Sequence, residues 1–477
     1  MTTSTVLQVL AALYLLWVVG ACATLLMERR SPTATLAWIF AFIAIPVVSG
    51  LYYMVFGPRR MKRRSKRYDA ARRALRRAHE NADGPARPKL NPDADALAAV
   101  ARRLEQGPAT YASAVMLLHD GDECARALES AINAATHHVH MEYYIWEPDQ
   151  TGTHFRDLLV AAAKRGIEVR VIYDDVGSPN VKASFWAPLI EAGGRVRAFN
   201  RVRLAFASIN FANFRTHRKI AVIDGATGFL GGINIHDPEL ASRAGKAAWR
   251  DLQARIAGEP VHRLQRLFLE SWNYCHGEFK LSTKTMENYF PATRCGAGIP
   301  AQIVASGPDD NNAPIHAFFL AAIGQARSRV LIETPYLVPD EPLETALRIA
   351  ELRGVDVQIV VPKRGDSWVV TAASHTYCES LRNAGIKVFE YGPPMLHAKT
   401  LVIDETVGVV GTANLDNRSF RLNFELAAAF YDKSVIDQLV ARFEQDRAGS
   451  RVFQARRRSS KLTVLLESLA RLTSPVL

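Results

Sequence analysis

Two long apolar stretches open the chain, and a dense run of basic residues follows them. The stretches are Val6–Met27 and Ala34–Phe56, separated by the charged segment Glu28–Arg30. At about 1.5 Å per helical residue, each is long enough to cross a hydrocarbon layer of about 30 Å. The pattern predicts a transmembrane hairpin over residues 1–57, with spans at about 6–27 and 34–56. A cleaved signal peptide is the alternative for the first stretch, but no Lys or Arg precedes its apolar core.

From about residue 108 onward the chain repeats itself. A helical pattern that runs into a β-branched strand occurs at Ala127–Ile145 and again at Ala317–Leu337, and further matching blocks follow in the same order. The repetition predicts two α/β domains, 108–295 and 296–477, related by a pseudo-twofold axis. The helix–Gly–strand units favour a largely parallel sheet covered by helices. Residues 58–107 are predicted to be a basic juxtamembrane linker.

The net charge of +12 is concentrated directly after the second apolar stretch. Residues 57–90 contain thirteen cations and three anions, a net charge of +10. By the positive-inside rule, this run places the exit of the second span, and therefore both chain ends, in the cytoplasm. A solvated basic helix is the alternative, although next to a membrane the same run would attract anionic lipid. Because the rest of the chain is nearly neutral, a broad nucleic-acid-binding face is not expected.

The last of the matching blocks in each repeat contains a His-x-Lys pair, and this pair carries reactive side chains. His217 and Lys219 stand at i and i+2, as do His397 and Lys399, so each pair projects from one face of a strand. Together they supply a nucleophile, a proton donor and fixed positive charge, which cleavage of a phosphodiester requires. The cysteines are scattered without zinc-site spacing, so we predict no metal and no cofactor.

Several motifs resemble the phospholipase D superfamily and, within it, the bacterial cardiolipin synthases. The paired HKD motifs, each with a following asparagine, are His217, Lys219, Asp224 and Asn234, and His397, Lys399, Asp404 and Asn414. Further similar segments are Thr334–Pro339, Trp249–Asp251, Gly411–Phe420 and Arg471–Leu477. One departure is His236–Glu239, where the family has a more glycine-rich stretch that ends in tyrosine. The resemblance covers essentially the whole chain. It implies two pseudo-symmetric phospholipase D-type α/β domains, each a mixed sheet flanked by helices, after an N-terminal transmembrane hairpin.

The resemblance also implies roles for the motif residues. His217 would form a phosphohistidine and His397 would act as acid and base, although the symmetry of the repeat leaves these two roles exchangeable. The groups that would hold the non-bridging phosphate oxygens are Lys219, Lys399, Asn234 and Asn414. Asp224 and Asp404 belong to the catalytic motifs, but they lie on the opposite strand parity from the histidines, so we interpret them as turn-stabilising carboxylates.

A nucleophilic imidazole also needs a carboxylate at its other nitrogen to fix the tautomer. The candidates are Asp251 and Glu425, which follow the asparagine of each repeat inside apolar stretches, where an unpartnered carboxylate would be costly. A salt bridge to Arg250 or Arg421 is the alternative explanation for them.

The function implied by the resemblance is a phosphatidyltransferase that condenses two phosphatidylglycerol molecules to cardiolipin and glycerol. The alternatives are a phospholipase D-type hydrolase, a transphosphatidylase with another lipid donor or acceptor and, more distantly, a non-catalytic membrane scaffold. The expected partners are phosphatidylglycerol, other anionic phospholipids and the membrane, with no nucleic acid, and a homo-oligomer is left open. The expected location is the bacterial inner membrane, in a multi-pass arrangement with both catalytic domains facing the cytoplasm.

Overall fold

The chain forms two units, which are described separately. The computed structural model describes residues 3–27, 32–56, 87–201, 213–275, 287–292, 296–310, 312–454, 467–468 and 470–471. The first unit consists of residues 1–59 with 202–213, and the second of residues 60–201 with 214–477.

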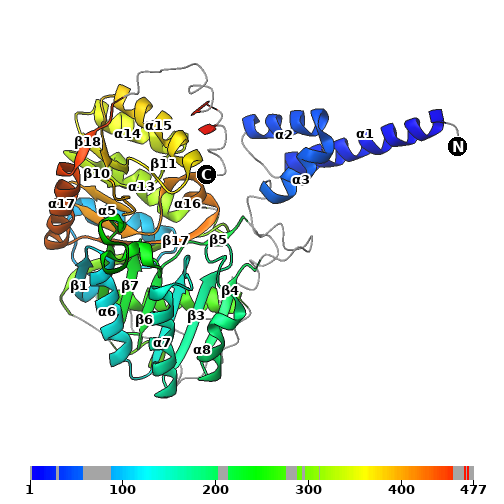
Figure 1. The fold of residues 1–477 in the computed structure, drawn as a ribbon. Helices are drawn as coiled ribbons and strands as arrows, with labels where there is room; N and C mark the ends of the chain where they lie inside the picture. Colours follow the sequence, from blue (N-terminus) through cyan, green and yellow to red (C-terminus); the bar gives the residue numbers. More distant parts are fainter. Residues whose placement is uncertain are drawn as a thin grey trace. The chain divides into compact units, whose positions relative to one another are not determined.

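The first unit contains the helices α1 (Thr3–Met27), α2 (Pro32–Ala44) and α3 (Pro46–Phe56) (Figure 1). Its aromatic side chains pack on one another, with the ring of Phe42 centred 5.3 Å from Trp17 and 5.4 Å from Tyr53. The second predicted span is wrong as a single helix, because Pro46 lacks the N–H that would continue α2. Within the described ranges, the structure contains no helix that combines the length and the hydropathy needed to cross a membrane.

The second unit begins with α5 (Pro92–Arg103) and continues through two halves. The elements of its first half are β1 (Thr110–Leu118), α6 (Gly121–Ala134), β2 (His138–Tyr143), α7 (Gln150–Lys164), β3 (Glu168–Asp174), η1 (Ala183–Trp186), α8 (Ala187–Glu191), β4 (Arg195–Phe199), β5 (Arg215–Thr216), β6 (Ile220–Ile223), β7 (Thr227–Gly231), η2 (Asp237–Glu239), α10 (Ala241–Ala244), η3 (Gly245–Ala247), β8 (Gln253–Gly258) and α11 (Pro260–Tyr274).

The second half repeats much of this order. Its elements are β9 (Ile299–Ser306), α13 (Pro314–Gln325), β10 (Arg329–Glu333), β11 (Leu337–Val338), α14 (Glu341–Leu352), β12 (Asp356–Pro362), α15 (Trp368–Asn383), β13 (Lys387–Tyr391), β14 (Thr400–Ile403), β15 (Val407–Gly411), β16 (Leu415–Asp416), α16 (Asn417–Arg421), β17 (Asn423–Phe430), α17 (Lys433–Ala448) and β18 (Ser450–Val452).

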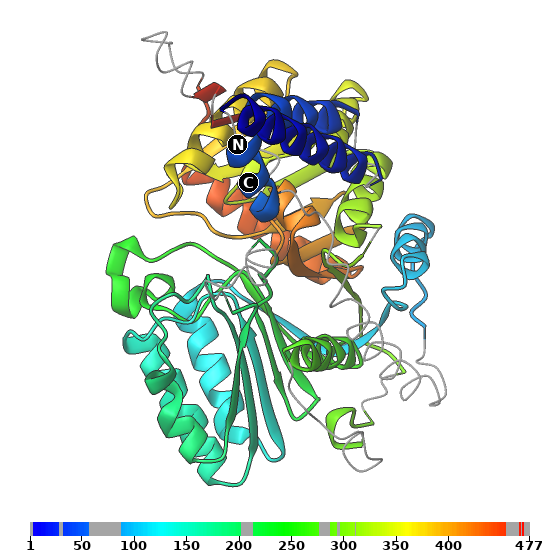
Figure 2. The ribbon, with the colours of Figure 1, turned by 90° about the vertical axis from the view of Figure 1, so that its right-hand side faces the viewer.

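One sheet of sixteen strands runs through both halves, which lie one above the other in Figure 2. From the middle outward, the first half has the order β1-β8-β7-β6-β2-β3-β4 and the second has β9-β17-β15-β14-β10-β12-β13, with β18 at its edge. The sixteenth strand, β5, lies off this path and pairs with β17. The antiparallel pair β1–β9, in which Thr110 lies opposite Ala301, joins the two halves. The two predicted domains, 108–295 and 296–477, therefore share a continuous sheet.

The sheet is mixed, as the family resemblance implies, and the expectation of a largely parallel sheet is wrong. In the first half β2, β3 and β4 run parallel, and in the second β10, β12 and β13 do so. The short strand β5 also pairs in parallel with β17, and the other neighbouring strands described in this sheet pair antiparallel. The strands that follow each His-x-Lys pair form antiparallel hairpins instead. A tight turn such as Asp224–Gly225, with φ of 54° and 66°, leaves no room for the crossover helix that parallel strands need.

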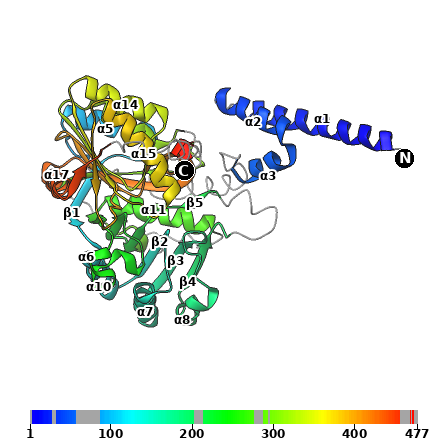
Figure 3. The same cartoon turned by 45° about the horizontal axis from the view of Figure 1, so that its top comes forward.

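Helices cover both faces of the sheet (Figure 3). On one face, α6 and α7 cover the first half, and α13 and α14 cover the second. On the other face, Val261 and Leu264 of α11 share one apolar core with Ile436 and Leu439 of α17. This shared core includes Ile220 after the first His-x-Lys pair and Leu396 and Ala398 beside His397, so it packs the segments that carry both pairs against one apolar cluster.

The predicted linker over residues 58–107 is partly wrong. Residues 57–86 lie outside the described residues, but α5 is a regular helix whose start is capped by the Asn91 side chain. Its apolar face is buried in the core of the second half, through Ala94, Leu97, Ala98 and Ala101. This i, i+3, i+4, i+7 spacing is that of an amphipathic helix, so α5 belongs to the globular unit.

Candidate active site

Each histidine is placed by a strand from the other half. β5 pairs in parallel with the start of β17, so that His217 lies next to Glu425, and its backbone N–H donates to the carbonyl of Phe424 at 2.9 Å. A parallel bridge between Arg250 and Leu396 does the same for His397, whose N–H donates to the carbonyl of Arg250 at 2.7 Å. The two histidines are therefore brought together only when both halves are folded.

The predicted orienting carboxylates contact the histidines in a crossed arrangement. Nδ1 of His217 lies 3.0 Å from Oε2 of Glu425, and Nδ1 of His397 lies 2.6 Å from Oδ2 of Asp251. The neighbouring arginines pair elsewhere, Arg250 with Asp446 at 2.7 Å and Arg421 with Asp340 at 2.8 Å. With Nδ1 engaged by a carboxylate, Nε2 is the nitrogen that each ring can offer to a substrate.

Both motif lysines are buried beside the histidines. The ammonium group of Lys219 donates to the carbonyl of His217 at 2.9 Å, and that of Lys399 donates to the carbonyl of His397. Burial, followed by the charge of Lys399, lowers the pKa of Lys219 to about 7, and burial also lowers the pKa of Lys399. Two buried cations this close favour binding of an anion, which would offset their repulsion.

Burial dominates the electrostatics of the two imidazoles. It lowers the pKa of His217 to about 4 despite the opposing charge of Glu425, and together with Lys399 it lowers the pKa of His397. Burial alone would raise the pKa of both carboxylates. At Glu425 the contact with His217 outweighs the effect of burial, and at Asp251 the charges of Lys399 and His397 do so. The pKa of each carboxylate is therefore lowered. The site therefore holds two ionised carboxylates against imidazoles that tend to be neutral.

A turn follows the hairpin in each half, and it contacts the orienting carboxylate of that half. The contact differs between Glu425 and Asp251. Thr412 donates through Oγ1 to Oε2 of Glu425 at 2.5 Å. At the equivalent place in the first half is Gly232, where a Cβ would lie 2.0 Å from Oδ1 of Asp251. Asp251 instead accepts the backbone N–H of Leu252 at 2.6 Å. Only glycine at position 232 allows the shorter aspartate side chain to reach His397.

The predicted phosphate-binding amides lie in the same buried turns. Oδ1 of Asn234 accepts the backbone N–H of Ile145 at 3.2 Å, and its Nδ2 lies 3.3 Å from Oε1 of Glu239. Oδ1 of Asn414 is buried without a hydrogen-bond partner among the described residues. Both amides sit beside their histidine hairpins, and their contact with phosphate stays a prediction.

Asp224 and Asp404 lie at the far end of their hairpins from the histidines. Both have positive φ, 54° and 49°. Each carboxylate accepts three consecutive backbone N–H groups at 2.8 Å, from Thr136, His137 and His138 for Asp224 and from Arg327, Ser328 and Arg329 for Asp404. These contacts fit a turn-stabilising role, and neither residue reaches the reacting centre.

An aromatic ring packs against each imidazole, at a steep angle and not stacked on it. The ring of Tyr144 is centred 4.9 Å from His217, and the ring of Trp249 is centred 4.9 Å from His397. The ammonium of Lys219 also lies 5.3 Å from the centre of the Tyr144 ring. The rings restrict how each imidazole can turn, which favours one orientation of Nε2.

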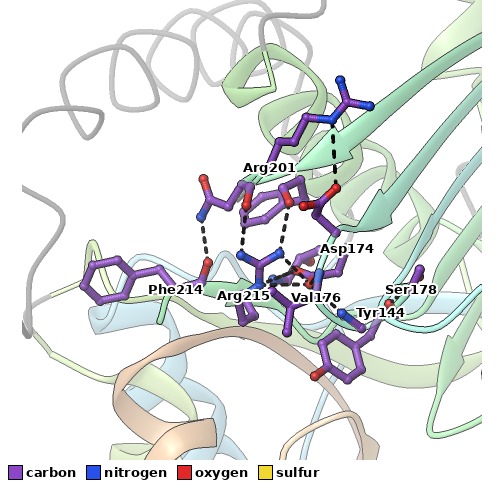
Figure 4. Close-up of polar contacts among 12 residues, drawn as sticks. Tyr144, Asp174, Val176, Ser178, Arg201, Phe214 and Arg215 are labelled. Atoms are coloured by element: carbon purple, nitrogen blue, oxygen red, sulfur yellow. Dashed lines mark hydrogen bonds and ion pairs between the residues drawn. The ribbon is translucent and has the colours of Figure 1, made fainter. Parts of the chain in front are cut away.

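A buried ion pair, which the sequence alone did not reveal, anchors the strand before His217 (Figure 4). Nη2 of Arg215 lies 2.6 Å from Oδ1 of Asp174, and the same carboxylate accepts the backbone N–H groups of Val176, Gly177 and Thr216. Because Arg215 and Thr216 form β5, this pair fixes the backbone that leads directly to His217. Asp174 and Arg215 are 41 positions apart, and no local sequence pattern connects them, so the ion pair could not be predicted from the sequence.

One further carboxylate, Glu239, also lies at the site. Among the described residues, only the group Glu239, Asp251 and His397 has three metal-ligand-type atoms within 4.8 Å of one another. Because Asp251 is already bonded to His397 and the Lys399 cation is close by, we interpret the group as an acid–base cluster and not as a metal centre. The only sequence signal for Glu239 is that it lies in the segment that departs from the family pattern.

Comparison with known proteins identifies the family. The family model described as cardiolipin synthase, PLD-like domain, matches residues 128–263 and 319–447, one match in each half. A cardiolipin synthase of Alkalihalophilus pseudofirmus is 36% identical over 94% of this chain and 90% of its own. The major cardiolipin synthase of Bacillus subtilis is 35% identical over 98% of both chains.

Among solved structures, a phosphatidylserine synthase of Haemophilus influenzae has a TM-score of 0.58 at 15% identity, covering 80% of this chain and 100% of its own. This likeness concerns the fold alone. The two family matches each contain one His-x-Lys pair, and the relatives align over nearly the full length. The chain is therefore an enzyme of the phospholipase D superfamily and belongs to its cardiolipin synthase family.

Proposed function

We propose that the enzyme condenses two phosphatidylglycerol molecules to cardiolipin and glycerol through a phosphohistidine on His217. The observation that carries the mechanism is the crossed pairing, in which each imidazole has Nδ1 on a buried carboxylate and Nε2 available. The choice of phosphatidylglycerol is supported by the names of the relatives, since cardiolipin consists of two phosphatidyl groups on one glycerol.

The first step transfers the phosphatidyl group to the enzyme. Nε2 of His217 attacks phosphorus, the bond from phosphorus to the glycerol oxygen breaks, and Nε2–H of His397 gives its proton to that oxygen. Lys219 and Lys399 stabilise the charge on the non-bridging oxygens as it grows. Glu425 stabilises the positive charge that develops on His217.

The second step reverses the roles of bond making and proton transfer. Neutral His397 takes the proton of a hydroxyl on a second phosphatidylglycerol, the hydroxyl oxygen attacks phosphorus, and the bond from phosphorus to His217 breaks. Water in place of that hydroxyl would release phosphatidic acid, which is the hydrolytic alternative. Exclusion of water therefore decides between transferase and hydrolase.

The test of the mechanism is to trap the intermediate. Enzyme mixed with phosphate-labelled phosphatidylglycerol and denatured in alkali should carry label that is lost in acid, as expected of a phosphohistidine. The label should be found on His217 and should be absent from His217→Ala. Label on His397 would reverse the assignment, and no label in an active enzyme would refute the covalent mechanism.

The test of the substrate is product analysis. With phosphatidylglycerol alone, the enzyme should release one glycerol for each cardiolipin formed. Phosphatidic acid as the main product would support the hydrolase. Cardiolipin formed only when phosphatidylethanolamine is added would identify a different lipid donor.

We also propose that residues 1–57 attach the enzyme to the bacterial inner membrane as a hairpin, with the catalytic halves in the cytoplasm. Support comes from the apolar side chains exposed on α1, α2 and α3, namely Leu15, Leu16, Val19, Leu26, Phe40, Val47 and Val48. Further support comes from the net charge of +10 over residues 57–90. A cysteine placed after Leu90 should resist a membrane-impermeant thiol reagent in intact cells, and its labelling would overturn this topology.

A further inference from the structure

The two halves of the site differ in charge five residues after each asparagine. In the second half the backbone N–H of Asn414 donates to the hydroxyl of Ser419 at 3.1 Å. In the first half the backbone N–H of Asn234 donates to Oε1 of Glu239 at 3.0 Å. The same structural position is therefore neutral in one half and holds a carboxylate in the other.

A well-anchored turn positions Glu239. The neighbouring Asp237 accepts the backbone N–H and the hydroxyl of Thr151, at 2.9 and 2.7 Å. On the other side, the backbone N–H of Trp249 donates to the carbonyl of Pro238 at 2.8 Å. Glu239 is 1% exposed, and within the described part of the chain its Oε2 is buried without a hydrogen-bond partner. The other oxygen, Oε1, also lies 3.3 Å from Nε2 of His236, so a second imidazole faces this carboxylate. A buried carboxylate oxygen without a partner, as Oε2 is, is costly to retain.

Among the groups with the largest effects on each imidazole, carboxylates outnumber ammonium groups at His397, and ammonium groups outnumber carboxylates at His217. The charged groups that act on His397 are two carboxylates, Asp251 and Glu239, and the ammonium of Lys399. Those that act on His217 are one carboxylate, Glu425, and the ammonium groups of Lys219 and Lys399. The Glu239 carboxylate lies with Asp251 and His397 in a group whose ligand-type side-chain atoms are all within 4.8 Å of one another. From this position it opposes the lowering of the His397 pKa by burial and Lys399.

We propose that Glu239 is a positioning residue that keeps the exchangeable proton on His397 and thereby makes His397 the acid and His217 the nucleophile. The inference rests on the proposed phosphohistidine mechanism. The Glu239 carboxylate also opposes the lowering of the pKa of Lys219 and of Lys399, but the proton that moves in the reaction belongs to His397. That proton passes from Nε2 of His397 to the departing glycerol oxygen and returns from the acceptor hydroxyl. The carboxylate itself gains and loses nothing.

The test is to measure the two half-reactions separately in Glu239→Gln. Gln keeps an oxygen that can accept the Asn234 N–H but removes the charge. Rapid quenching of the full-length enzyme in mixed micelles gives the rate of phosphoenzyme formation, and addition of unlabelled phosphatidylglycerol gives the rate of transfer. Formation needs protonated His397 and transfer needs neutral His397, so one lost charge should change the two rates in opposite directions.

The expected result is a shift of both pH profiles to lower pH by about one unit, because a charge within 4.8 Å of a buried imidazole has an effect of this size. At a pH on the basic limb, formation should be about tenfold slower than in the wild type. At a pH on the acidic limb, transfer should be about tenfold faster. A residue that merely anchored Asn234 would slow both steps at every pH.

Two further variants complete the test. Asp237→Asn removes a carboxylate from the same turn, but one that faces Thr151, so its pH profiles should match the wild type. Glu239→Ser copies the neutral residue of the second half and should shift the profiles as Gln does, which keeps the test valid if the Gln variant does not fold.

The outcomes separate the inference from the mechanism on which it rests. If the pH profiles of both Glu239 variants match the wild type, the role of Glu239 is overturned while the phosphohistidine stays in place. The same holds if the only shift is on the acidic limb of the profile for phosphoenzyme formation. A wild-type enzyme that makes cardiolipin without a labelled intermediate would overturn the proposed mechanism itself, and the role of Glu239 with it.

Discussion

The substitution Asp251→Asn tests the crossed pairing most directly. It removes the charge that lies 2.6 Å from Nδ1 of His397 and changes the side-chain volume very little. The backbone N–H of Leu252 can still donate to the Asn oxygen, and Gly232 still leaves space for it. The variant should therefore fold, and its loss of activity should report on His397.

The magnitude follows from the bond that is lost. A hydrogen bond to a charged group contributes about 1.5–3 kcal/mol, which at about 1.4 kcal/mol per factor of ten corresponds to about 10- to 150-fold in rate. An Asn can also present its NH₂ to the imidazole and stabilise the wrong tautomer, and the same exchange in a serine-protease triad costs about 10⁴-fold. We expect kcat/KM to fall by about 10²- to 10⁴-fold.

The assay is the initial rate of cardiolipin formation from labelled phosphatidylglycerol in mixed micelles, with the melting temperature measured on the same preparations. The matched control is Glu333→Gln. Burial raises the pKa of Glu333 to about 8, so its carboxyl is largely protonated at neutral pH and an amide of the same shape changes little. We expect this control to retain kcat/KM within about threefold of the wild type.

A folded Asp251→Asn enzyme with kcat/KM within threefold of the wild type would refute the reasoning. It would mean that the His397–Asp251 contact is packing and not part of catalysis. Equal losses in Asp251→Asn and Glu333→Gln would show instead that any buried carboxylate in this region is needed for folding alone.

Three further predictions concern other contacts of the site and its turns. Thr412→Val removes the hydroxyl that donates to Glu425 and accepts the backbone N–H of Leu426, so kcat should fall about tenfold and the free energy of unfolding by about 1–3 kcal/mol. Asp224→Ala removes an acceptor of three backbone N–H groups and should lower the free energy of unfolding by about 2 kcal/mol in denaturant titrations, while kcat per folded enzyme is unchanged. For Glu333 the folded pKa lies above the unfolded one, so the native state binds the extra proton and wild-type stability falls as pH rises from about 4.5 to 8. Glu333→Gln lacks this loss, so its melting temperature should rise relative to wild type across that window, and a constant difference would contradict the raised pKa.

The repeated blocks of sequence predicted the two halves and both His-x-Lys pairs, because each pair lies within a local strand pattern. The antiparallel hairpins were not predicted, because a strand pattern does not show whether its neighbour is parallel. Helix α5 was misjudged because its alanine-rich face follows the basic run, and a composition shift looked like a linker. Pro46 ends α2 although proline can be accommodated within apolar helices, since the outcome depends on neighbours that the sequence does not show.

The candidate carboxylates were found by a burial argument, but their partners were not. Asp251 and Glu425 lie in apolar stretches and need a counter-charge. That Glu425 contacts His217, 208 residues away, and that Asp251 contacts His397, 146 residues away, follows from how the halves pack. Long-range pairing of this kind leaves no local pattern. The departure at His236–Glu239 was visible, yet its carboxylate gained a role only when the fold placed it beside His397.

The crossed pairing also determines when during synthesis the enzyme becomes active. His217 leaves the ribosome long before Glu425, and at about 5–20 residues per second the 208 residues between them take roughly 10–40 seconds to make. Until β17 has been added, His217 lacks its carboxylate, whereas Asp251 has been made before His397. A nascent chain that ends before β17 therefore lacks the carboxylate that its nucleophile needs, even though it already contains both His-x-Lys pairs.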